Sequence, residues 1–385
     1  MYSFQENSLK NSNEKNFNKK KNIPKETYTQ IKNLGSGSFG IVFLIQSNKT
    51  NIQYVCKNID LNQFDKEEEK SALSEVSVLK KCKHPNIILF KEAFITKYPY
   101  RRLHLITEYA ENGDLYKILE AQKKKNQHFE ESEIINWLIQ TCLALKYIHN
   151  LHVIHRDIKP QNLFLTKNGI IKIGDFGISK ILNKNHTKTN THIGTPLYMA
   201  PEVIESKKYD YKADIWSLGI TFFELMSFKS PYKANNSYGL FLNIVNGYKS
   251  YSINNIADCS YSNELYYIVN KMISNNPSKR PDIDEILSVP IINKHLNEFL
   301  EKNRDLYKGV NLYIKKDNEN KSKSLNEQEN NGLGTIFEEN EEKYKNYSNK
   351  YILQTSDNDY SQDYLPNQNQ ITDSYSIFKE YTLDK

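Results

Sequence analysis

Two short stretches in the middle of the chain decide its fold. Residues 155–162 read HRDIKPQN, and residues 174–177 read GDFG. Runs rich in β-branched and aromatic residues come before them and predict strands over 28–34, 40–47, 53–59, 87–95 and 103–108. A helical stretch over 67–81 lies among these strands, and longer helical runs, such as 131–150, follow them. The sequence therefore predicts an α+β protein with a β-rich part followed by a mainly helical part.

A glycine-rich stretch, residues 35–42 (GSGSFGIV), lies between two of the expected strands. A GxGxxG pattern is also typical of dinucleotide-binding turns, but those lead into a helix, whereas a strand follows here. The stretch therefore fits a hairpin whose backbone can close over phosphate groups. Lys57 comes 17 residues after Gly40, and Glu75 on the following helix could pair with it. A single lysine in a strand is usually a solvated edge residue. Lys57 and Glu75 therefore indicate a functional pair only together with the motifs around them.

A further motif, APE at residues 200–202, follows in order. Taken together, the motifs resemble those of the eukaryotic protein kinases, and the resemblance covers roughly residues 28–295. It implies the two-lobed kinase fold, with a small antiparallel β lobe carrying one main helix over 28–107, a hinge over 108–110 and a large, mainly helical lobe over 111–295. The basic segment 1–27 and the acidic, Asn-rich segment 296–385 have little to bury and are expected to be largely disordered.

The resemblance implies an enzyme that uses ATP and Mg²⁺ to phosphorylate serine or threonine in proteins. Phosphoryl transfer depends on holding metal, nucleotide and hydroxyl in line more than on covalent help from the protein. By resemblance, Asp157 accepts or orients the proton of the substrate hydroxyl, and Lys159 neutralises the γ-phosphate. Thr195 matches the threonine that hydrogen-bonds both residues. Lys159 and Thr195 together indicate the serine/threonine type.

The same resemblance assigns the metal and nucleotide sites. Asn162 and Asp175 would bind magnesium, which prefers oxygen ligands. Lys57 would meet the α- and β-phosphates, Phe164 would lie under the adenine, and the backbone of Glu108 and Ala110 would pair with it. The residues expected around the nucleotide are Leu34, Gly35, Gly37, Gly40, Val42, Val55, Lys57, Glu75, Thr107, Glu108, Ala110, Asp114 and Phe164.

Three further residues are implied to be structural. Asp214 would cap the backbone of the catalytic loop, and Glu202 and Arg280 would form a buried ion pair that anchors the large lobe.

Within the kinases, several details resemble the NIMA-related (Nek) group. They include Gly174 before the DFG motif, Val55 where most kinases have alanine, and GDL at residues 113–115. Thr107 occupies the gatekeeper position, where this group often has a bulkier residue, so we expect an open space behind the adenine. The resemblance implies substrates with a hydrophobic residue three positions before the phosphorylated Ser or Thr. It also implies a cytoplasmic protein acting in cell-cycle, cytoskeletal, centrosomal or ciliary control.

Arg156 and the segment before Thr195 suggest regulation by phosphorylation. An arginine next to the catalytic aspartate commonly receives a phosphate, and the new charge-assisted hydrogen bonds order the loop. Thr191 matches the activating position of the family and is the first candidate, followed by Thr189 and Thr187. The alternative is that these threonines only make a polar, flexible loop.

Charge and hydropathy exclude some classes of function. The 385 residues carry a net charge of +6, divided into +3 over residues 1–27, +8 over residues 28–296 and −5 over residues 297–385. The basic residues form no nucleic-acid-binding motif, and no window reaches the ~20 apolar residues that cross a bilayer, so neither nucleic acid nor membrane insertion is expected. The acidic tail could contact the basic domain as a weak autoinhibitor. Four scattered cysteines indicate reduced, buried thiols.

Two alternatives stay open from the sequence. A pseudokinase scaffold would act through its surface, but such a protein would lack Lys57, Asp157, Asn162 or Asp175, and all four are present. An active Ser/Thr kinase of another subfamily, such as the calmodulin-dependent or autophagy type, would use the same catalytic residues.

Overall fold

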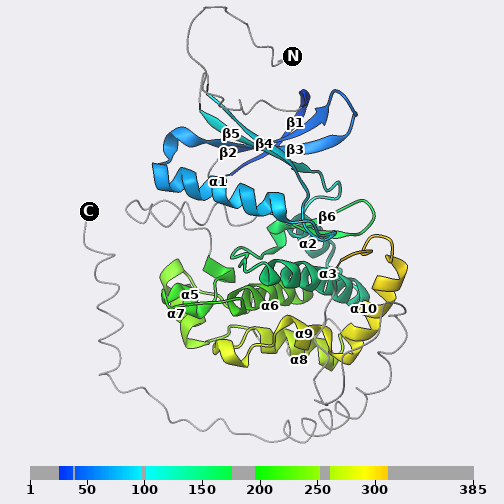
Figure 1. Ribbon diagram of the computed structural model, residues 1–385. Coiled ribbons are helices and arrows are strands. Elements are labelled where there is room, and N and C mark those ends of the chain that lie inside the picture. The colour runs from blue at the N-terminus through cyan, green and yellow to red at the C-terminus, as the bar shows by residue number, and fades with distance from the viewer. Residues whose placement is uncertain (1–25, 38–39, 98–100, 176–195, 252–260, 311–385) are drawn as a thin grey trace, which may run out of the picture. The chain divides into compact units, whose positions relative to one another are not determined.

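The computed structural model describes residues 26–37, 40–97, 101–175, 196–251 and 261–310 (Figure 1). All of these lie in the first of the two units into which the chain divides, Met1–Asp317 and Asn318–Lys385. Thr187, Thr189, Thr191 and Thr195 fall outside the described residues.

A five-stranded antiparallel sheet forms the first part of the described chain. Its strands lie in the order β1-β2-β3-β5-β4. They are β1 (Tyr28–Gly37), β2 (Gly40–Ser47), β3 (Gln53–Asp60), β4 (Phe90–Thr96) and β5 (Arg102–Glu108).

The register of this sheet decides which side chains share a face. Val42 pairs with Lys57, Val55 pairs with Thr107, and Lys57 pairs with Leu105. Directly paired residues project to the same side, and alternate residues of a strand share a face. Val42, Val55, Lys57 and Thr107 therefore lie on one face of the sheet. The other face carries a separate small apolar cluster that includes Ile45, Cys56 and Ile106.

Helix α1 (Lys66–Lys81) packs beside strand β4 (Figure 1). Its buried residues include Ala72, Val76 and Leu79, which recur at four- and three-residue steps and so form one apolar stripe. Leu79 belongs to the main core cluster, so α1 is attached to the rest of the fold by burial of this stripe.

The second part of the chain is mainly helical. Its helices are α2 (Leu115–Lys125), α3 (Glu131–Asn150), α5 (Pro201–Ile204), α6 (Lys212–Ser227), α7 (Ser237–Asn246), α8 (Asn263–Met272), α9 (Ile283–Leu287) and α10 (Pro290–Lys302). A two-stranded sheet of β6 (Leu163–Leu165) and β7 (Ile171–Ile173) lies between α3 and α5 in the sequence. Short 3-10 turns cover Leu61–Gln63, Pro160–Asn162, Pro196–Tyr198 and Pro277–Lys279. The architecture confirms the predicted two-lobed α+β kinase fold.

Helix α6 is the centre of this helical part. Every residue from Ala213 to Ser227 is buried, and the helix contacts both α3 and α8. A helix that is buried on every side has no solvent face and lies inside the fold. Truncating a fully buried residue such as Phe222 to alanine would cost about 3–5 kcal/mol.

Three of the cysteines are free thiols buried in the fold, as the sequence predicted. Burial raises the pKa of Cys56 to about 12 and that of Cys82 to about 11, so both stay protonated at neutral pH. Cys142 is also buried, and Cys259 lies outside the described residues.

The domain boundary expected at residue 295 falls inside helix α10. The helix continues to Lys302, because Ile292 and Leu296 are buried and Phe299 and Leu300 pack against the same core. Turns follow as far as Tyr307, which is only 5% exposed. Within the described ranges, every helix is too short or too polar to span a membrane.

Candidate active site

The loop between α3 and β6 brings three predicted residues into direct contact. Asn162 donates hydrogen bonds from Nδ2 to the Oδ2 of Asp157 (2.8 Å) and to its backbone carbonyl (2.7 Å). The ammonium group of Lys159 lies 2.8 Å from the same Oδ2. Asp157 is 9% exposed, so its carboxylate is held in a defined position at the surface of the core. An amide, an ammonium group and a carboxylate therefore converge on one point of the loop.

Asp214 on α6 holds the backbone of this loop in place by hydrogen bonds. Its carboxylate accepts hydrogen bonds from the backbone N–H of His155 (2.9 Å) and Arg156 (2.8 Å), and from Nε2 of His149 (2.8 Å). Arg156 has a φ of 69°, a left-handed conformation that costs a non-glycine residue about 1–3 kcal/mol. The hydrogen bonds to Asp214 offset this strain, so the carboxylate is what holds the loop in its conformation.

The charge of Asp214 is maintained despite complete burial. Burial alone would raise its pKa, but the hydrogen bond and charge of His149, with smaller contributions from His155 and the Arg156 N–H, lower the pKa overall. The Asp214 carboxylate therefore stays unprotonated and only accepts hydrogen bonds, as its three donors require. The sequence predicted Asp214 as the cap but did not predict His149, whose last-turn position on α3 carries no motif.

A second carboxylate, Asp175, follows strand β7 and meets the sheet. The Nζ of Lys57 on β3 lies 2.8 Å from Oδ1 of Asp175. The Lys57 charge is the main cause that lowers the pKa of Asp175, against the opposing effect of partial desolvation by the surrounding protein. Glu75 lies on α1, but its side chain is outside the described part of the chain, so its pairing with Lys57 stays a prediction.

Backbone contacts join the two carboxylate-bearing segments. The N–H of Gly174 donates to the carbonyl of Asn162 (3.0 Å), and Nε2 of His155 donates to the carbonyl of Gly174 (3.1 Å). The loop with Asp157 and the turn with Asp175 are thus connected directly.

Two glycines are required by close contacts. A Cβ at Gly40 would lie 1.7 Å from the carbonyl oxygen of Asn58, so only glycine lets β2 approach β3 at this point. A Cβ at Gly174 would lie 2.8 Å from the ring of Phe164 and 3.1 Å from Ile88. The glycine before the DFG motif therefore makes room for the aromatic ring that was predicted to lie under adenine.

The side chains of Glu108 and Ala110, at the end of β5 and just after it, are engaged or buried, which leaves their backbone for a nucleotide. The carboxylate of Glu108 accepts a hydrogen bond from the N–H of Leu89 (2.6 Å) and pairs with Lys172 (2.8 Å). The Ala110 side chain is buried, and its carbonyl accepts from the N–H of Gly113 (3.2 Å). The sequence did not predict Lys172, because its partner lies on a different element.

Other predicted nucleotide residues surround this segment. Val42, Val55 and Thr107 share the sheet face described above, and Leu34 and Gly35 lie on β1 beside a register shift. Gly37 ends β1. Asp114 caps α2 by accepting from the N–H of Lys117 (3.0 Å), so part of its carboxylate is used locally. Its contact with a ribose stays a prediction.

Glu202 and Arg280 form the ion pair that the sequence predicted. The guanidinium nitrogens lie 2.6 and 2.8 Å from the two carboxylate oxygens, and Arg280 is 1% exposed. Arg280 also donates to the backbone carbonyls of Ser274, Lys212 and Asn275. A buried, bidentate ion pair in which the other guanidinium N–H groups also have acceptors holds the segments that it joins in place.

Arg156, the predicted phosphate receiver, lies on the catalytic loop. Its guanidinium group lies 5.7 Å from the centre of the Tyr209 ring, within range of a cation–π contact. No motif in the sequence predicted this contact with Tyr209.

The donor set of the site fits a nucleotide with a divalent cation. Asp175 and Asn162 offer hard oxygen ligands, Lys57 and Lys159 offer positive charge for phosphate oxygens, and the Gly40 contact keeps the glycine-rich hairpin close to β3. The fold and the site together are those of the protein kinase class.

Comparison with known proteins agrees with this class. The family model described as protein kinase domain matches residues 28–292. The chain therefore belongs to the protein kinase family.

Among curated proteins, the chain is similar to several Nek kinases. It is 38% identical over 275 residues to serine/threonine-protein kinase Nek1 of Mus musculus, a match that covers 71% of this chain and 22% of Nek1. It is 36% identical over 279 residues to mouse Nek4, covering 72% of this chain and 34% of Nek4. With the probable serine/threonine-protein kinase nek3 of Dictyostelium discoideum it shares 38% identity over 275 residues, or 70% of this chain and 24% of that protein. The chain thus spans about a fifth to a third of these relatives, and the predicted NIMA-related resemblance is confirmed.

Proposed function

We propose that the chain is an ATP-dependent serine/threonine protein kinase of the NIMA-related type. The observation that carries the proposal is the convergence of Asn162 and Lys159 on the carboxylate of Asp157. The ion pair between Lys57 and Asp175 adds the second half of the site. The relatives reported above are named as serine/threonine-protein kinases, which supports the same reaction.

Each residue has a defined task in this proposal. When bound, Mg·ATP would supply the phosphoryl group and a divalent positive charge beside the phosphates. Asp157 orients the substrate hydroxyl and takes its proton, and Lys159 balances the negative charge beside it. Asn162 and Asp175 would hold the metal, and Lys57 the phosphates. Asp214 and His149 keep the loop in place before any substrate arrives, so little reorganisation is needed for the reaction.

The finer properties rest on the resemblance to the NIMA-related group. We expect substrates with a hydrophobic residue three positions before the phosphorylated Ser or Thr, activation through Thr191, and cytoplasmic work in cell-cycle, cytoskeletal, centrosomal or ciliary control. Weak autoinhibition by the acidic residues 297–385 is a charge-based expectation. Deleting residues 311–385, which keeps Tyr307, would leave activity unchanged if that expectation is wrong.

A transfer assay with the full chain tests the proposal. The substrates are two serine peptides that differ only in leucine or arginine three positions before the serine, with Mg·ATP as donor. We expect turnover on the order of 1 s⁻¹ or more, a preference for leucine, and a loss of about 10²-fold or more in Asp157→Asn. A preference for arginine would overturn the subfamily. Binding of ATP without any transfer, even after phosphorylation of Thr191, would favour the scaffold alternative.

A further inference from the structure

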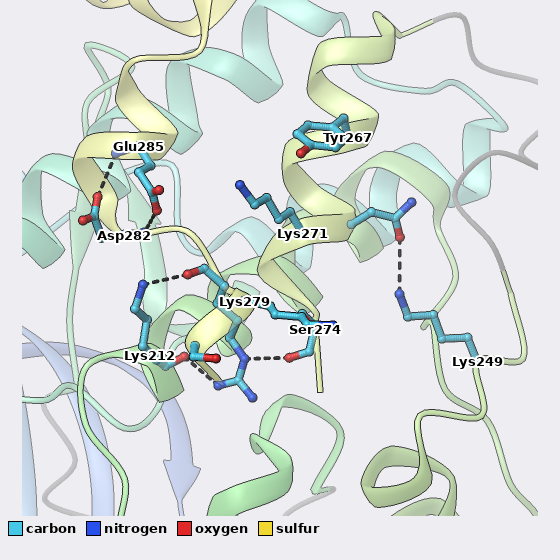
Figure 2. Close-up of a pocket in the computed structure, with 11 residues that line it drawn as sticks. Lys212, Lys249, Tyr267, Lys271, Ser274, Lys279, Asp282 and Glu285 are labelled. Atoms are coloured by element: carbon cyan, nitrogen blue, oxygen red, sulfur yellow. Dashed lines mark hydrogen bonds between the residues drawn. The ribbon is translucent and has the colours of Figure 1, made fainter. Parts of the chain in front are cut away.

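A pocket of about 810 Å³ lies away from the proposed active site, where α8, the turn Pro277–Lys279 and the first residues of α9 meet the start of α6 (Figure 2). Its charged lining residues include four lysines from four different segments. They are Lys212, Lys249, Lys271 and Lys279. None of them is among the residues assigned to the nucleotide, the metal or the transfer step.

Within the described residues, the four lysines of this pocket outnumber the two carboxylates that line it. In the described part of the chain, none of these four lysines pairs with a carboxylate within ion-pair distance. Lys212 donates to the carbonyl of Arg280 (2.7 Å), and Lys249 lies 3.4 Å from the amide oxygen of Asn270 (Figure 2). Neutral oxygens are weak substitutes for a counter-ion, so a bound anion would gain charge-assisted hydrogen bonds here.

The two acidic residues of the pocket are already used by their own helix. Asp282 accepts from the N–H of Glu285 (2.8 Å), and Glu285 accepts from the N–H of Asp282 (2.7 Å), which makes a capping box at the start of α9. Neither carboxylate lies within ion-pair distance of a pocket lysine. The side chain of Lys249 reaches solvent, and partial desolvation by the protein around it lowers its pKa.

The floor of the pocket is rigid. Arg280 holds the carbonyls of Ser274 and Lys212, and its guanidinium group is fixed by Glu202 and lies 5.0 Å from the Trp216 ring. The backbone that carries the lysines therefore needs little reorganisation when a ligand binds, and only their side chains must become ordered.

We propose that this pocket is a docking site for an acidic, phosphate-bearing peptide segment of a protein substrate. The pocket is concave and carries the carboxylates of Asp282 and Glu285 on one side, so it does not suit a flat lipid surface or a continuous polyanion such as RNA. A peptide can place a phosphate among the lysines and keep neutral residues near the carboxylates. The ring of Tyr267, 44% exposed with Lys271 at 5.8 Å, offers an apolar contact for such a chain. The proposal rests on the proposed kinase function and adds a recruitment step to it.

Binding of a labelled peptide tests the proposal directly. The probe is a short fluorescein-labelled peptide with one phosphoserine and several glutamates, compared with the same peptide carrying serine and glutamines. Fluorescence anisotropy is measured with the full chain, with Lys249→Gln/Lys271→Gln/Lys279→Gln, and with the matched control Lys125→Gln/Lys294→Gln/Lys302→Gln. The control lysines are exposed on α2 and α10, and removing them changes the net charge equally.

We expect the pocket variant to lose about tenfold or more in affinity for the phosphopeptide, and the control to stay within about twofold. Equal losses in both variants would show a nonspecific charge effect and overturn the proposal. Tighter binding of an RNA oligonucleotide or of phosphatidylserine vesicles would also overturn it. If the triple variant does not fold, the single changes Lys249→Gln and Lys279→Gln at exposed positions provide the same comparison.

Kinetics separate this proposal from the proposed function. With a serine peptide that lacks the acidic segment, the pocket variant should keep the kcat and KM of the wild type. With the same peptide joined to the acidic phosphopeptide, KM should rise in the pocket variant while kcat stays unchanged. Anisotropy with Asp157→Asn should match the wild type, because docking does not need transfer. A chain that binds the phosphopeptide but transfers no phosphate would contradict only the kinase function.

Discussion

Tyr307 donates a 2.5 Å hydrogen bond to the side-chain oxygen of Asn86, from 221 residues further along the chain. The amide nitrogen of Asn86 donates to Gln140 (3.0 Å) and to the carbonyl of Ile171 (2.9 Å), and the Asn86 carbonyl accepts from the N–H of Ile173 (2.8 Å). The residues after α10 thus support the loop between α1 and β4, and through it the strand that leads to Asp175. The segment beyond residue 295 belongs to the folded domain.

We therefore expect Tyr307→Phe to destabilise the domain. The change removes a donor and leaves the oxygen of buried Asn86 without it, at a cost of about 1–3 kcal/mol. For a domain of this size, Tm should fall by about 2–8 °C in thermal unfolding followed by circular dichroism. Tyr248→Phe is the matched control, because Tyr248 is 63% exposed. Equal Tm values for the two variants would show that the hydrogen bond contributes nothing.

The sequence predicted those parts of the fold that depend on local periodicity. The helix expected over 131–150 and the strand expected over 40–47 are found at these residues, as α3 and β2. The strand expected over 87–95 begins only at Phe90, because Ile87 and Ile88 join the core beside β7 and Ile87 forms a bridge to Ile173. Apolar residues in a short run do not reveal which partner will bury them.

The positions of the site residues were predicted from motifs, together with the Glu202–Arg280 ion pair and the cap by Asp214, whereas other contacts were not. Tyr307 lies in a polar stretch with no motif, so nothing local links it to Asn86. The motifs likewise did not show that Lys57 contacts Asp175, because the same lysine was expected to pair with Glu75. Which carboxylate the lysine contacts depends on how the two lobes meet. That arrangement is a property of the whole packed chain.

Two buried histidines should make the stability pH-dependent. Burial, with smaller contributions from Lys172 and Arg102, lowers the pKa values of His84 and His104 to about 4. The unfolded chain therefore binds more protons between pH 4 and about pH 6.5, and stability falls as the pH decreases through this window. Across this window, each histidine changes the free energy of unfolding by up to about 3 kcal/mol.

Urea unfolding at a series of pH values in this window measures the effect. We expect His104→Gln to reduce the slope of the unfolding free energy against pH by about one proton. The variant also loses the stacking on Phe94, so its stability at neutral pH will be lower, but only the slope reports the titration. A slope as steep as that of the wild type would contradict the prediction.

Gly174→Ala should weaken nucleotide binding. The new methyl group would meet the ring of Phe164 at 2.8 Å, and displacing that ring costs about 1–3 kcal/mol and disturbs the expected adenine contact. We expect KM for ATP to rise about tenfold. The double variant Gly174→Ala/Phe164→Leu removes the ring that causes the clash, so it should recover part of the lost stability. If the Tm of the double variant does not recover, the contact with Phe164 is not the cause of the lost stability.

Phosphorylation of Thr191 should activate the enzyme through Arg156. A phosphate near the guanidinium group would form charge-assisted hydrogen bonds worth about 1.5–3 kcal/mol each. We expect Thr191→Ala to lower turnover about tenfold and Thr187→Ala to have a smaller effect. Arg156→Gln should remove the difference between phosphorylated and unphosphorylated enzyme, although the Arg156 backbone N–H to Asp214 is retained. Unchanged turnover in Thr191→Ala would refute this assignment.

Thr107 should decide which inhibitors the enzyme accepts. It pairs with Val55 on β3 and with Phe90 on β4, so its side chain shares a sheet face with Val55 and Val42. A small side chain here leaves space that a longer one would fill, and one or two buried methylenes change binding by about 10- to 200-fold. We therefore expect Thr107→Met to weaken inhibitors that extend behind the adenine by at least about tenfold, with KM for ATP nearly unchanged. The measurement is the inhibition constant of one such compound and of a smaller analogue that stops at the adenine position, each on both enzymes. The smaller analogue should not distinguish them, and equal potency of the larger compound would show that Thr107 does not border the inhibitor pocket.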